Sequence, residues 1–188
     1  MNETINRCPW CGDDPLYIRY HDEEWGKKVT EDKVLFEFLI LESAQAGLSW
    51  ITILRKREGY RKLFADFDAN KVARFTEEQI DSITQDPAII RHRGKVAAAV
   101  SNAQIFLAIQ KEFGSFYNYL YSFMPEKMPI RNNLTSMKDA ATSTPQSDAI
   151  SKDLKKRGIK FFGTTICYAF MQAVGMVNDH LDICHFKN

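Results

Sequence analysis

Apolar positions along the chain recur with the spacing of α-helices, and strict alternation of apolar and polar residues is nearly absent. Residues 31–44 (EDKVLFEFLILESA) and 94–114 (GKVAAAVSNAQIFLAIQKEFG) carry apolar residues three and four positions apart, as one face of a helix requires. Residues 164–175 (TTICYAFMQAVG) are apolar on all sides, which is typical of a helix at the centre of a core. The pattern predicts an all-α fold without internal repeats.

Local signals predict where one short helix and one long helix begin and end. Thr76 and Gln79 form a capping box, so a short helix should begin there and continue to about Gln85. The Asp-Pro pair that follows should end it, since a residue before proline disfavours helical backbone. Gly114 should end the next, longer helix.

Two further helices have candidate capping residues at their starts. Thr30 should cap the helix after it, and either Thr144 or Ser147 should open a helix that Gly158 closes. Residues 124–146 are rich in Pro, Asn, Ser and Thr, and we interpret them as an excursion between two helical parts.

Composition places the chain among ordinary globular proteins. Of 188 residues, 45% are hydrophobic and 26% are charged, and four cysteines are too few for a scaffold built on disulfides. The N-terminus lacks the apolar segment of a secretory signal, and no apolar stretch is long enough to span a bilayer. We therefore expect a cytoplasmic protein, in which a cysteine pair binds metal or acts in catalysis.

Basic residues gather in three clusters although the net charge is only +1: residues 55–62, 91–95 and 152–158. Solvated helix faces would explain any one of them, but three clusters on a nearly neutral chain favour local contacts with anions. The cluster at 91–95 (RHRGK) belongs to a hairpin between two helices, whose backbone N–H groups suit a phosphate. There His92 should face solvent or phosphate; plain packing of the two helices is the alternative.

Glu42 lies on the apolar face of its predicted helix, where a carboxylate is costly unless it is paired. The helix should break at Gly47, which exposes Leu48 on a loop shortly before Trp50. A buried anion beside an indole would bind a flat cation through charge and cation–π attraction. The alternative is that Glu42 lies at the end of its helix and reaches solvent. Two residues could add to the aromatic wall or simply pack in the core: Tyr17 and Tyr20.

Cysteines and histidines at the two ends of the chain could bind a metal ion. Cys8 and Cys11 are spaced as in redox dithiols and in half of many zinc sites, and His21 follows. His180 and Cys184 are four residues apart, which would place two ligands on one helix face. Two ligands from each end would make a closed Cys2His2 site that joins the termini. A redox dithiol would instead come with a thioredoxin-like βαβ pattern, which is absent.

Several stretches of the chain resemble the type I 3-methyladenine DNA glycosylases, bacterial base-excision repair enzymes of the helix–hairpin–helix superfamily. They follow the family's order nearly from end to end: RCPW, DPLYIRYHDEEWG, LESAQAGLSWITIL, IIRHRGK, SDAISKDLKKRGIKFFGTTICYAFMQAVGMVNDH and the final cysteine. The resemblance implies an all-α helix–hairpin–helix fold, removal of alkylated adenine from DNA, and one structural zinc ion that clips the N- and C-terminal segments together.

The resemblance also implies roles for individual residues. Four would bind the zinc ion: Cys8, His21, His180 and Cys184. Three would be catalytic in the base pocket, with two more beside them: Glu42, Tyr20 and Trp50, then Tyr17 and Trp10. Six would contact DNA through the wedge loop and the hairpin: Gly47, Leu48, Arg91, Arg93, Gly94 and Lys95. Cys11 departs from the pattern of the family. At that position the resemblance leads us to expect a small residue that binds no metal.

The implied mechanism follows from the chemistry of the damaged base. The enzyme would flip it out of double-stranded DNA, because a base inside the duplex cannot reach a pocket. The positive charge of N3-alkylated adenine already weakens its glycosidic bond, so selecting the cation matters more than acid catalysis. Water would release free 3-methyladenine without lyase activity, since no lysine is evidently placed for Schiff-base chemistry.

We expect a single glycosylase unit over residues 1–188 that acts as a monomer and not at a membrane. Its helix–hairpin–helix part should cover roughly residues 31–123, with 1–30 and 147–188 packed together around zinc. A catalytically silent, zinc-containing DNA-binding module is the alternative, but it would not need a carboxylate in an aromatic pocket.

Overall fold

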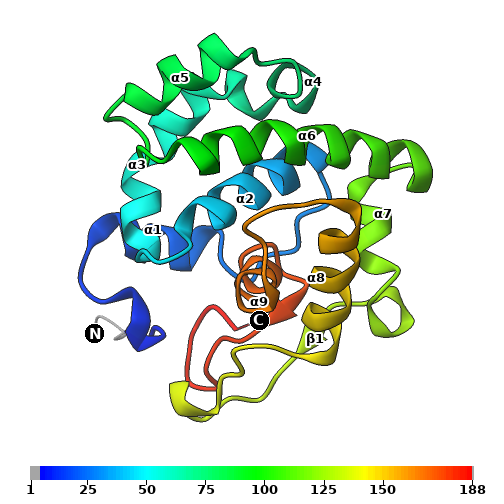
Figure 1. The fold of residues 1–188 in the computed structure, drawn as a ribbon. Helices are drawn as coiled ribbons and strands as arrows, with labels where there is room; N and C mark the ends of the chain where they lie inside the picture. The colour runs from blue at the N-terminus through cyan, green and yellow to red at the C-terminus, as the bar shows by residue number, and fades with distance from the viewer. Residues whose placement is uncertain (1–4, 188) are drawn as a thin grey trace.

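The computed structural model describes residues 5–187; residues 1–4, which belong to the N-terminus expected to carry no secretory signal, lie outside it, as does residue 188. Helices dominate the described chain, as predicted (Figure 1). The α-helices are α1 (Pro15–Glu23), α2 (Asp32–Gln45), α3 (Trp50–Leu63), α4 (Ala69–Val72), α5 (Glu77–Gln85), α6 (Arg93–Phe113), α7 (Phe116–Tyr121), α8 (Pro145–Arg157) and α9 (Thr164–Ala173). Short 3-10 helices are η1 (Pro9–Cys11), η2 (Ala65–Phe67), η3 (Pro125–Lys127) and η4 (Met137–Asp139). None of the helices described here combines the length and apolarity that crossing a membrane would require.

Two short strands connect the excursion after α7 to the C-terminal segment. β1 (Ile130–Arg131) and β2 (Val177–Asn178) pair in parallel, with Ile130 opposite Val177. An isolated bridge between Leu134 and Leu181 extends the pairing. The residue pattern did not predict these strands, because pairs this short depend on tertiary contacts more than on local alternation.

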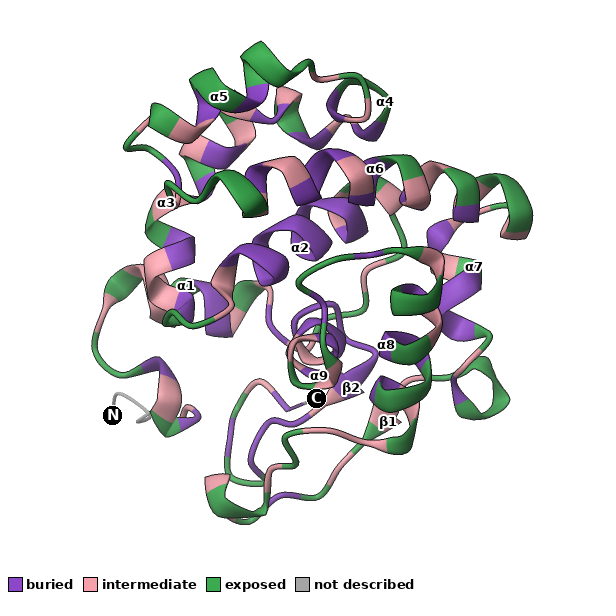
Figure 2. Ribbon diagram, viewed as in Figure 1, coloured by how far each residue is buried: buried purple, intermediate pink, exposed green. Residues whose placement is uncertain are grey.

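α2 is the centre of the core. Every residue from Leu35 to Ala44 is buried, although this run includes Glu37 and Glu42. α3, α6 and α9 contact α2, and α9 also packs on α8 (Figures 1 and 2). Five of the ten residues of α9 are buried, so this helix lines the core, whereas the sequence pattern had predicted it at the centre. Because α2 is surrounded by protein, its polar groups need partners from neighbouring elements.

The predicted boundaries of α5 and α6 are confirmed. Thr76 N donates to Gln79 Oε1 at 2.9 Å, and Gln79 N donates to Thr76 Oγ1 at 3.3 Å, which completes the capping box. α5 ends at Gln85. Gly114 ends α6 with a φ of 81°, the left-handed conformation that glycine adopts most easily.

Residues 86–92 join α5 to α6 as a tight hairpin. Asp86 Oδ1 accepts a hydrogen bond from the backbone N–H of Ala88 at 2.8 Å, which stabilises the start of the turn. The hairpin packs closely on α3, where a Cβ added to Gly59 would lie 2.3 Å from the carbonyl oxygen of Ala88. Glycine is therefore required at position 59 if the hairpin is to hold its place.

The two capping alternatives for α8 both have a role. Thr144 is the N-cap and accepts from the backbone N–H of Ser147 at 3.3 Å, while Ser147 Oγ accepts from the backbone N–H of Thr144 at 2.8 Å. Gly158 closes the helix with a φ of 104°, as predicted.

The predicted cap of α2 is wrong. Thr30 does not cap it; Glu31 is the N-cap residue, and its side chain makes no capping hydrogen bond. The carboxylate of Asp32 instead accepts from the backbone N–H groups of Phe116 at 2.7 Å and Tyr117 at 3.0 Å. The first residue of α2 therefore caps the start of α7, a long-range contact that no local pattern reveals.

Asp32→Ala should destabilise the protein by about 1–3 kcal/mol, because two backbone donors and the side-chain amide of Gln110 lose a shared charged acceptor. Glu31→Ala is the matched control, and its free energy of unfolding should stay within about 0.5 kcal/mol of wild type. Urea unfolding at neutral pH measures both. Equal stabilities of the two variants would contradict the role of Asp32 as the joint between α2 and α7.

Candidate functional site

A pocket of about 220 Å³ opens between α1, α2, α3 and α9. It is smaller than the roughly 300–1,000 Å³ of sites for drug-sized ligands, and its size suits a single flat ring system. Half of its ten lining residues are aromatic, and three others are an acid or amides: Trp10, Tyr17, Tyr20, Trp25, Glu42, Gln45, Trp50, Met137, Ala169 and Gln172. The structure thus brings all five predicted pocket residues together.

The aromatic side chains contact one another around the pocket. The ring of Trp10 lies 5.0 Å from that of Tyr17 and 4.9 Å from that of Trp25, centroid to centroid, both edge to face. The rings of Tyr20 and Trp50, the first residue of α3, are 5.6 Å apart. These contacts hold the rings against one another, so a ligand would meet a wall that is already formed.

Glu42 extends from α2 to this pocket without a counter-ion. Its side chain belongs to a residue only 2% exposed, and Oε2 has no hydrogen-bond partner within the described residues. Burial raises the pKa of the Glu42 carboxyl well above its usual value. Nε1 of Trp10 and Nε1 of Trp50 are also buried and have no partner in the part of the chain that the structure describes. Three buried polar groups of pocket residues therefore lack a partner among the described residues, which makes them candidates for contacts with a ligand.

The other buried glutamate of α2 has a different environment. Glu37 Oε1 accepts from Nε of Arg57 at 2.6 Å and from Nε of Arg61 at 3.0 Å, both on α3. Among residues 5–187, Glu37 therefore pairs with two guanidinium groups and Glu42 with none. Of these two carboxylates, only Glu42 is placed to meet a positively charged ligand.

Several residues of the pocket were not predicted from the sequence. Trp25 follows α1 in the stretch EEWG, and its nearness to the tyrosines was a signal that could have identified it. Gln172 on α9 donates from Nε2 to Asp179 Oδ2 at 2.7 Å, and the hydroxyl of Tyr168 donates to the same oxygen at 2.7 Å. No local pattern marks Gln172, because its position depends on how α9 packs on α2. The others are Gln45, Met137 and Ala169.

The loop between α2 and α3 lies next to the pocket, because residues on both sides of it line the pocket. Gly47 has a φ of 83°, and Leu48 is 40% exposed, as the sequence predicted. Nζ of Lys95 donates to the carbonyl oxygens of Ala44 and Ala46, at 2.8 Å each. Lys95 is therefore not a free cation of the hairpin; it ties the start of α6 to the loop that carries Leu48.

The remaining hairpin residues differ in their surroundings. Arg93 pairs with two carboxylates of α5, at 2.6 and 2.7 Å, whereas Arg91 is exposed and has no ion pair among residues 5–187. His92 is exposed, as expected, but it also caps α6, since its Nδ1 accepts from the backbone N–H of Lys95 at 3.2 Å. Gly94 is exposed in the first turn of α6. Residues 91–94 are therefore all exposed, and Arg91 is the one of their two arginines that has no ion pair among residues 5–187.

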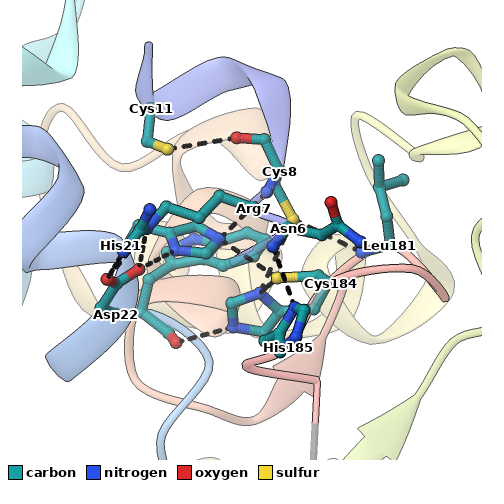
Figure 3. Close-up of polar contacts among 11 residues, drawn as sticks. Asn6, Arg7, Cys8, Cys11, His21, Asp22, Leu181, Cys184 and His185 are labelled. Atoms are coloured by element: carbon teal, nitrogen blue, oxygen red, sulfur yellow. Dashed lines mark hydrogen bonds and ion pairs between the residues drawn. The ribbon is translucent and has the colours of Figure 1, made fainter. Parts of the chain in front are cut away.

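Four buried residues from the two ends of the chain meet in one cluster: Cys8, His21, His180 and Cys184. Figure 3 labels three of them, Cys8, His21 and Cys184. The four ligand atoms all lie within 4.8 Å of one another. Cys184 Sγ is 3.5 Å from His21 Nε2 and 3.4 Å from His180 Nδ1. Cys8 Sγ is 3.6 Å from His180 Nδ1. The four atoms could hold a metal ion.

Both histidines of the cluster are oriented through the ring nitrogen that points away from it. His21 Nδ1 lies 2.7 Å from Asp22 Oδ1, and His180 Nε2 lies 3.1 Å from the carbonyl oxygen of Trp25. Burial lowers the pKa of His180 to about 4 and raises the pKa of the Cys8 thiol to about 12. Neutral imidazoles and thiols that a bound cation deprotonates are the donors that a structural metal site uses.

His180 and Cys184 do not lie on a helix, so that part of the prediction is wrong. α9 ends at Ala173, and both residues follow β2 in an irregular segment. A turn in which Cys184 N donates to Leu181 O at 2.9 Å brings the two side chains together. The four-residue spacing identified His180 and Cys184 as a pair. A turn, and not a helix, brings their side chains together.

Cys11 lies outside the cluster (Figure 3). Its thiol donates to the carbonyl oxygen of Cys8 at 3.2 Å, while Cys8 Sγ accepts from the backbone N–H of Leu181 at 3.4 Å. All four cysteines are free and buried. The C-x-x-C spacing therefore contributes one thiol to the cluster and one to the local turn.

Known proteins match this chain over nearly its whole length. The family model for methyladenine glycosylase matches residues 10–188. DNA-3-methyladenine glycosylase 1 of Escherichia coli (strain K12) is 51% identical over 180 residues, which are 96% of each chain. The DNA-3-methyladenine glycosylase of Haemophilus influenzae is 49% identical over 181 residues, 96% of this chain and 97% of the relative.

The fold also matches a solved structure that describes how 3-methyladenine is recognised by 3-methyladenine DNA glycosylase I from Staphylococcus aureus. The two chains are 39% identical, and the TM-score is 0.94 over 98% of this chain and 97% of the other. The helical architecture described above is therefore shared with a protein of that activity.

Glu42→Gln should stabilise the protein at alkaline pH, because the folded state disfavours the ionised carboxyl. When folding raises the pKa of a carboxyl, that carboxyl contributes its full stability to the folded state at pH values below its ordinary pKa. The contribution is lost as the pH rises through the raised pKa of the folded state. Melting temperatures of variant and wild type should agree near about pH 4 and separate toward about pH 9. Circular dichroism at several pH values measures this.

Glu37→Gln is the matched control on the same helix. It should lower the melting temperature at neutral pH, since Arg57 and Arg61 lose their shared carboxylate. A Glu42→Gln variant that melts below wild type at alkaline pH would contradict the conclusion that Glu42 is buried without compensation.

Proposed function

Because the chain belongs to the methyladenine glycosylase family, we propose that it excises 3-methyladenine from alkylated DNA by hydrolysing the N-glycosidic bond. The observation that carries this proposal is the Glu42 carboxylate, which is buried in an aromatic pocket without a counter-ion. N3-alkylated adenine in DNA is a flat cation, and such a pocket suits it. The products are free 3-methyladenine and an abasic site.

Charge is the property by which this pocket distinguishes damaged from normal adenine. A neutral adenine beside Glu42 leaves the carboxylate unpaired, whereas the alkylated base supplies the missing positive charge. Trp50 and Tyr20 add aromatic faces, which attract a cation by roughly 0.5–2 kcal/mol. The pocket therefore stabilises the positively charged base and discriminates against the neutral one.

Hydrolysis of this substrate needs little further assistance, because the positive charge already weakens the bond to the sugar. α6 carries its only carboxylate, Glu112, at its far end, so the helix after the hairpin brings no acid near its start. Lys95, the lysine of the hairpin, is held by carbonyl oxygens and does not act as a nucleophile. The reaction therefore ends at an abasic site in an intact strand.

Access to the pocket requires the base to leave the duplex. Leu48, exposed on the loop after α2, would enter from the minor groove and fill the vacated step, with Gly47 allowing the turn. Arg91 and the backbone at Gly94 would hold phosphates, while Arg93 keeps the hairpin attached to α5. Such contacts fix position on the duplex and carry no sequence information.

We further propose that the cluster of Cys8, His21, His180 and Cys184 holds one structural zinc ion. Zinc bonds of about 2.3 Å to sulfur and about 2.0–2.1 Å to nitrogen, at the tetrahedral angle, separate the two ligand atoms by about 3.6 Å. The three sulfur–nitrogen distances of 3.4, 3.5 and 3.6 Å agree with that value. Four protein ligands complete the tetrahedron, so the ion would clip the two ends of the chain together without entering the reaction.

The chain would work as one unit and as a monomer, since a single chain supplies the whole pocket. Residues 31–123 would form the helix–hairpin–helix part, and residues 1–30 and 147–188 would pack around zinc. The four free, buried cysteines support a reducing cytoplasm as the place of action.

The purified protein should release 3-methyladenine from methylated duplex DNA and leave the strand unbroken. Chromatography of the released bases and gel electrophoresis with and without alkali measure the two results. Release of 7-methylguanine at a comparable rate would argue against a pocket selective for alkylated adenine. Strand cleavage without alkali would contradict simple hydrolysis.

Glu42→Gln tests charge selection directly, because it keeps the shape of the side chain and removes the charge. Its kcat/KM for excision should fall by roughly 10- to 150-fold, the equivalent of a lost hydrogen bond to a charged group. Binding to undamaged duplex should not change. Excision at the wild-type rate would remove Glu42 from the recognition of the base.

Cys8→Ser should lose the metal ion and much of the protein's stability, because the free energy of metal binding appears as free energy of folding. Cys11→Ala should retain one zinc ion per chain and melt close to wild type, since its thiol bonds only to a backbone carbonyl. Atomic absorption and thermal melting measure both variants. Loss of zinc from Cys11→Ala alone would overturn the ligand assignment, and wild-type protein without zinc would overturn the zinc proposal.

A further inference from the structure

The loop between α8 and α9, residues 158–163, carries an exposed aromatic side chain. Phe161 is 39% exposed, one of five large apolar residues with high exposure in the described chain. The loop runs beneath α6 in Figure 1, where it is drawn in orange. The base pocket does not include Phe161, so nothing in the excision mechanism above accounts for it.

The backbone on both sides of Phe161 is held rigidly. Asn102 of α6 is fully buried and donates from Nδ2 to Lys160 O at 3.1 Å, while its Oδ1 accepts from Lys160 N at 2.9 Å. Ser151 Oγ of α8 donates to Phe162 O at 3.0 Å. Side chains from two helices therefore fix the backbone of the loop. The exposure of Phe161 is not the result of a flexible backbone.

Phe161 adopts a backbone conformation that a bulky residue rarely tolerates. Its φ is +58°, in the left-handed region. Strain of this kind persists only where the surrounding structure imposes it, and it is concentrated at functional sites. Here the clamp on residues 160 and 162 imposes it, and the result is a ring directed to the surface beside α6.

The ring lies against the hairpin. Its centroid is 6.0 Å from that of His92, edge to face, and a Cβ on Gly94 would lie 3.9 Å from Phe161 Cζ. The same first turn of α6 carries Lys95, whose ammonium holds the loop of Leu48. The start of α6 thus contacts Phe161 directly through His92 and, through Lys95, holds the backbone just before Leu48.

The charge around Phe161 complements a polyanion. A groove along the loop is lined by Lys155, Lys160 and Phe161. Both lysines are exposed, and neither forms an ion pair within residues 5–187. A ring flanked by free ammonium groups matches a DNA strand, in which apolar sugar faces alternate with phosphates.

We propose that the loop of residues 158–163 is a further DNA-binding element of this protein, in which Phe161 packs on a deoxyribose and Lys160 neutralises a neighbouring phosphate. The proposal rests on the proposed function, since it needs duplex DNA as the partner. The loop lies on the DNA strand beside the phosphates that the hairpin binds. It holds the duplex in place while Leu48 occupies the step that the flipped base has left.

Phe161→Ala should weaken binding to a duplex with an abasic-site analogue by about 5- to 10-fold, as expected for a lost, partly buried aromatic contact. Fluorescence anisotropy over a range of salt concentrations measures the affinity. Phe161→Ala should leave the salt dependence unchanged, because an apolar contact releases no counterion, whereas Lys160→Ala should lower the slope by about one. KM for excision should rise with the affinity loss, while kcat stays within about twofold.

Three controls separate this role from folding. Phe161→Gly removes ring and backbone strain together, so it should bind duplex as weakly as Phe161→Ala and melt no lower. Met128→Ala removes another exposed apolar side chain, 58% exposed on the excursion after α7, and should bind like wild type. Binding of free 3-methyladenine, followed by tryptophan fluorescence, should be unaffected in every variant.

The proposal would be overturned if both Phe161 variants bound duplex with an affinity within about twofold of wild type. It would also be overturned if Lys160→Ala left the salt dependence of binding unchanged. This result is distinct from failure of the proposed function. Wild-type protein that excises no 3-methyladenine would overturn the function, whatever the affinities of the loop variants.

Discussion

A helix buried on all sides must have its charged groups satisfied by its neighbours, and this requirement on α2 organises the whole molecule. At its start, Asp32 caps α7. In its middle, Glu37 is paired with guanidinium groups of α3. At its end, the last carbonyls accept from Lys95 of α6. Glu42 is the carboxylate of α2 that these neighbours leave unpaired, and it is the one at the pocket.

Two chemically separate sites share parts of the same scaffold. The ring of Trp25 lines the pocket, and its carbonyl oxygen accepts from His180, a member of the cluster of cysteines and histidines. Gln172 lines the pocket from α9, and its carbonyl oxygen accepts from Gly26 N at 3.0 Å. The residue beside His180, Asp179, holds the side-chain amide of Gln172. The cluster thus supports the wall that faces the ligand.

Local sequence signals correctly predicted the helix boundaries that depend on contacts between neighbouring residues. The capping box at Thr76 and the glycine stops at 114 and 158 depend on residues a few positions apart, and all three were predictable. Glu42 was identifiable as a candidate because a carboxylate on an apolar face is unusual. The partners of Lys95 and the position of Gln172 were not, since each depends on how distant helices pack. The strands and the turn at His180 share that dependence on tertiary contacts.

The cluster of Cys8 with His180 spans 172 positions of sequence, and this separation orders the assembly of the enzyme during translation. At about 5–20 residues per second, a ribosome needs roughly 9–34 s to deliver the second partner after the first. Throughout that interval α1 has no C-terminal segment to cover His21, and the wall around Trp25 is incomplete. A nascent chain released early would carry the hairpin and Leu48 but no finished pocket. A chain that stops before His180 would therefore lack the contact that supports Trp25 in the pocket wall.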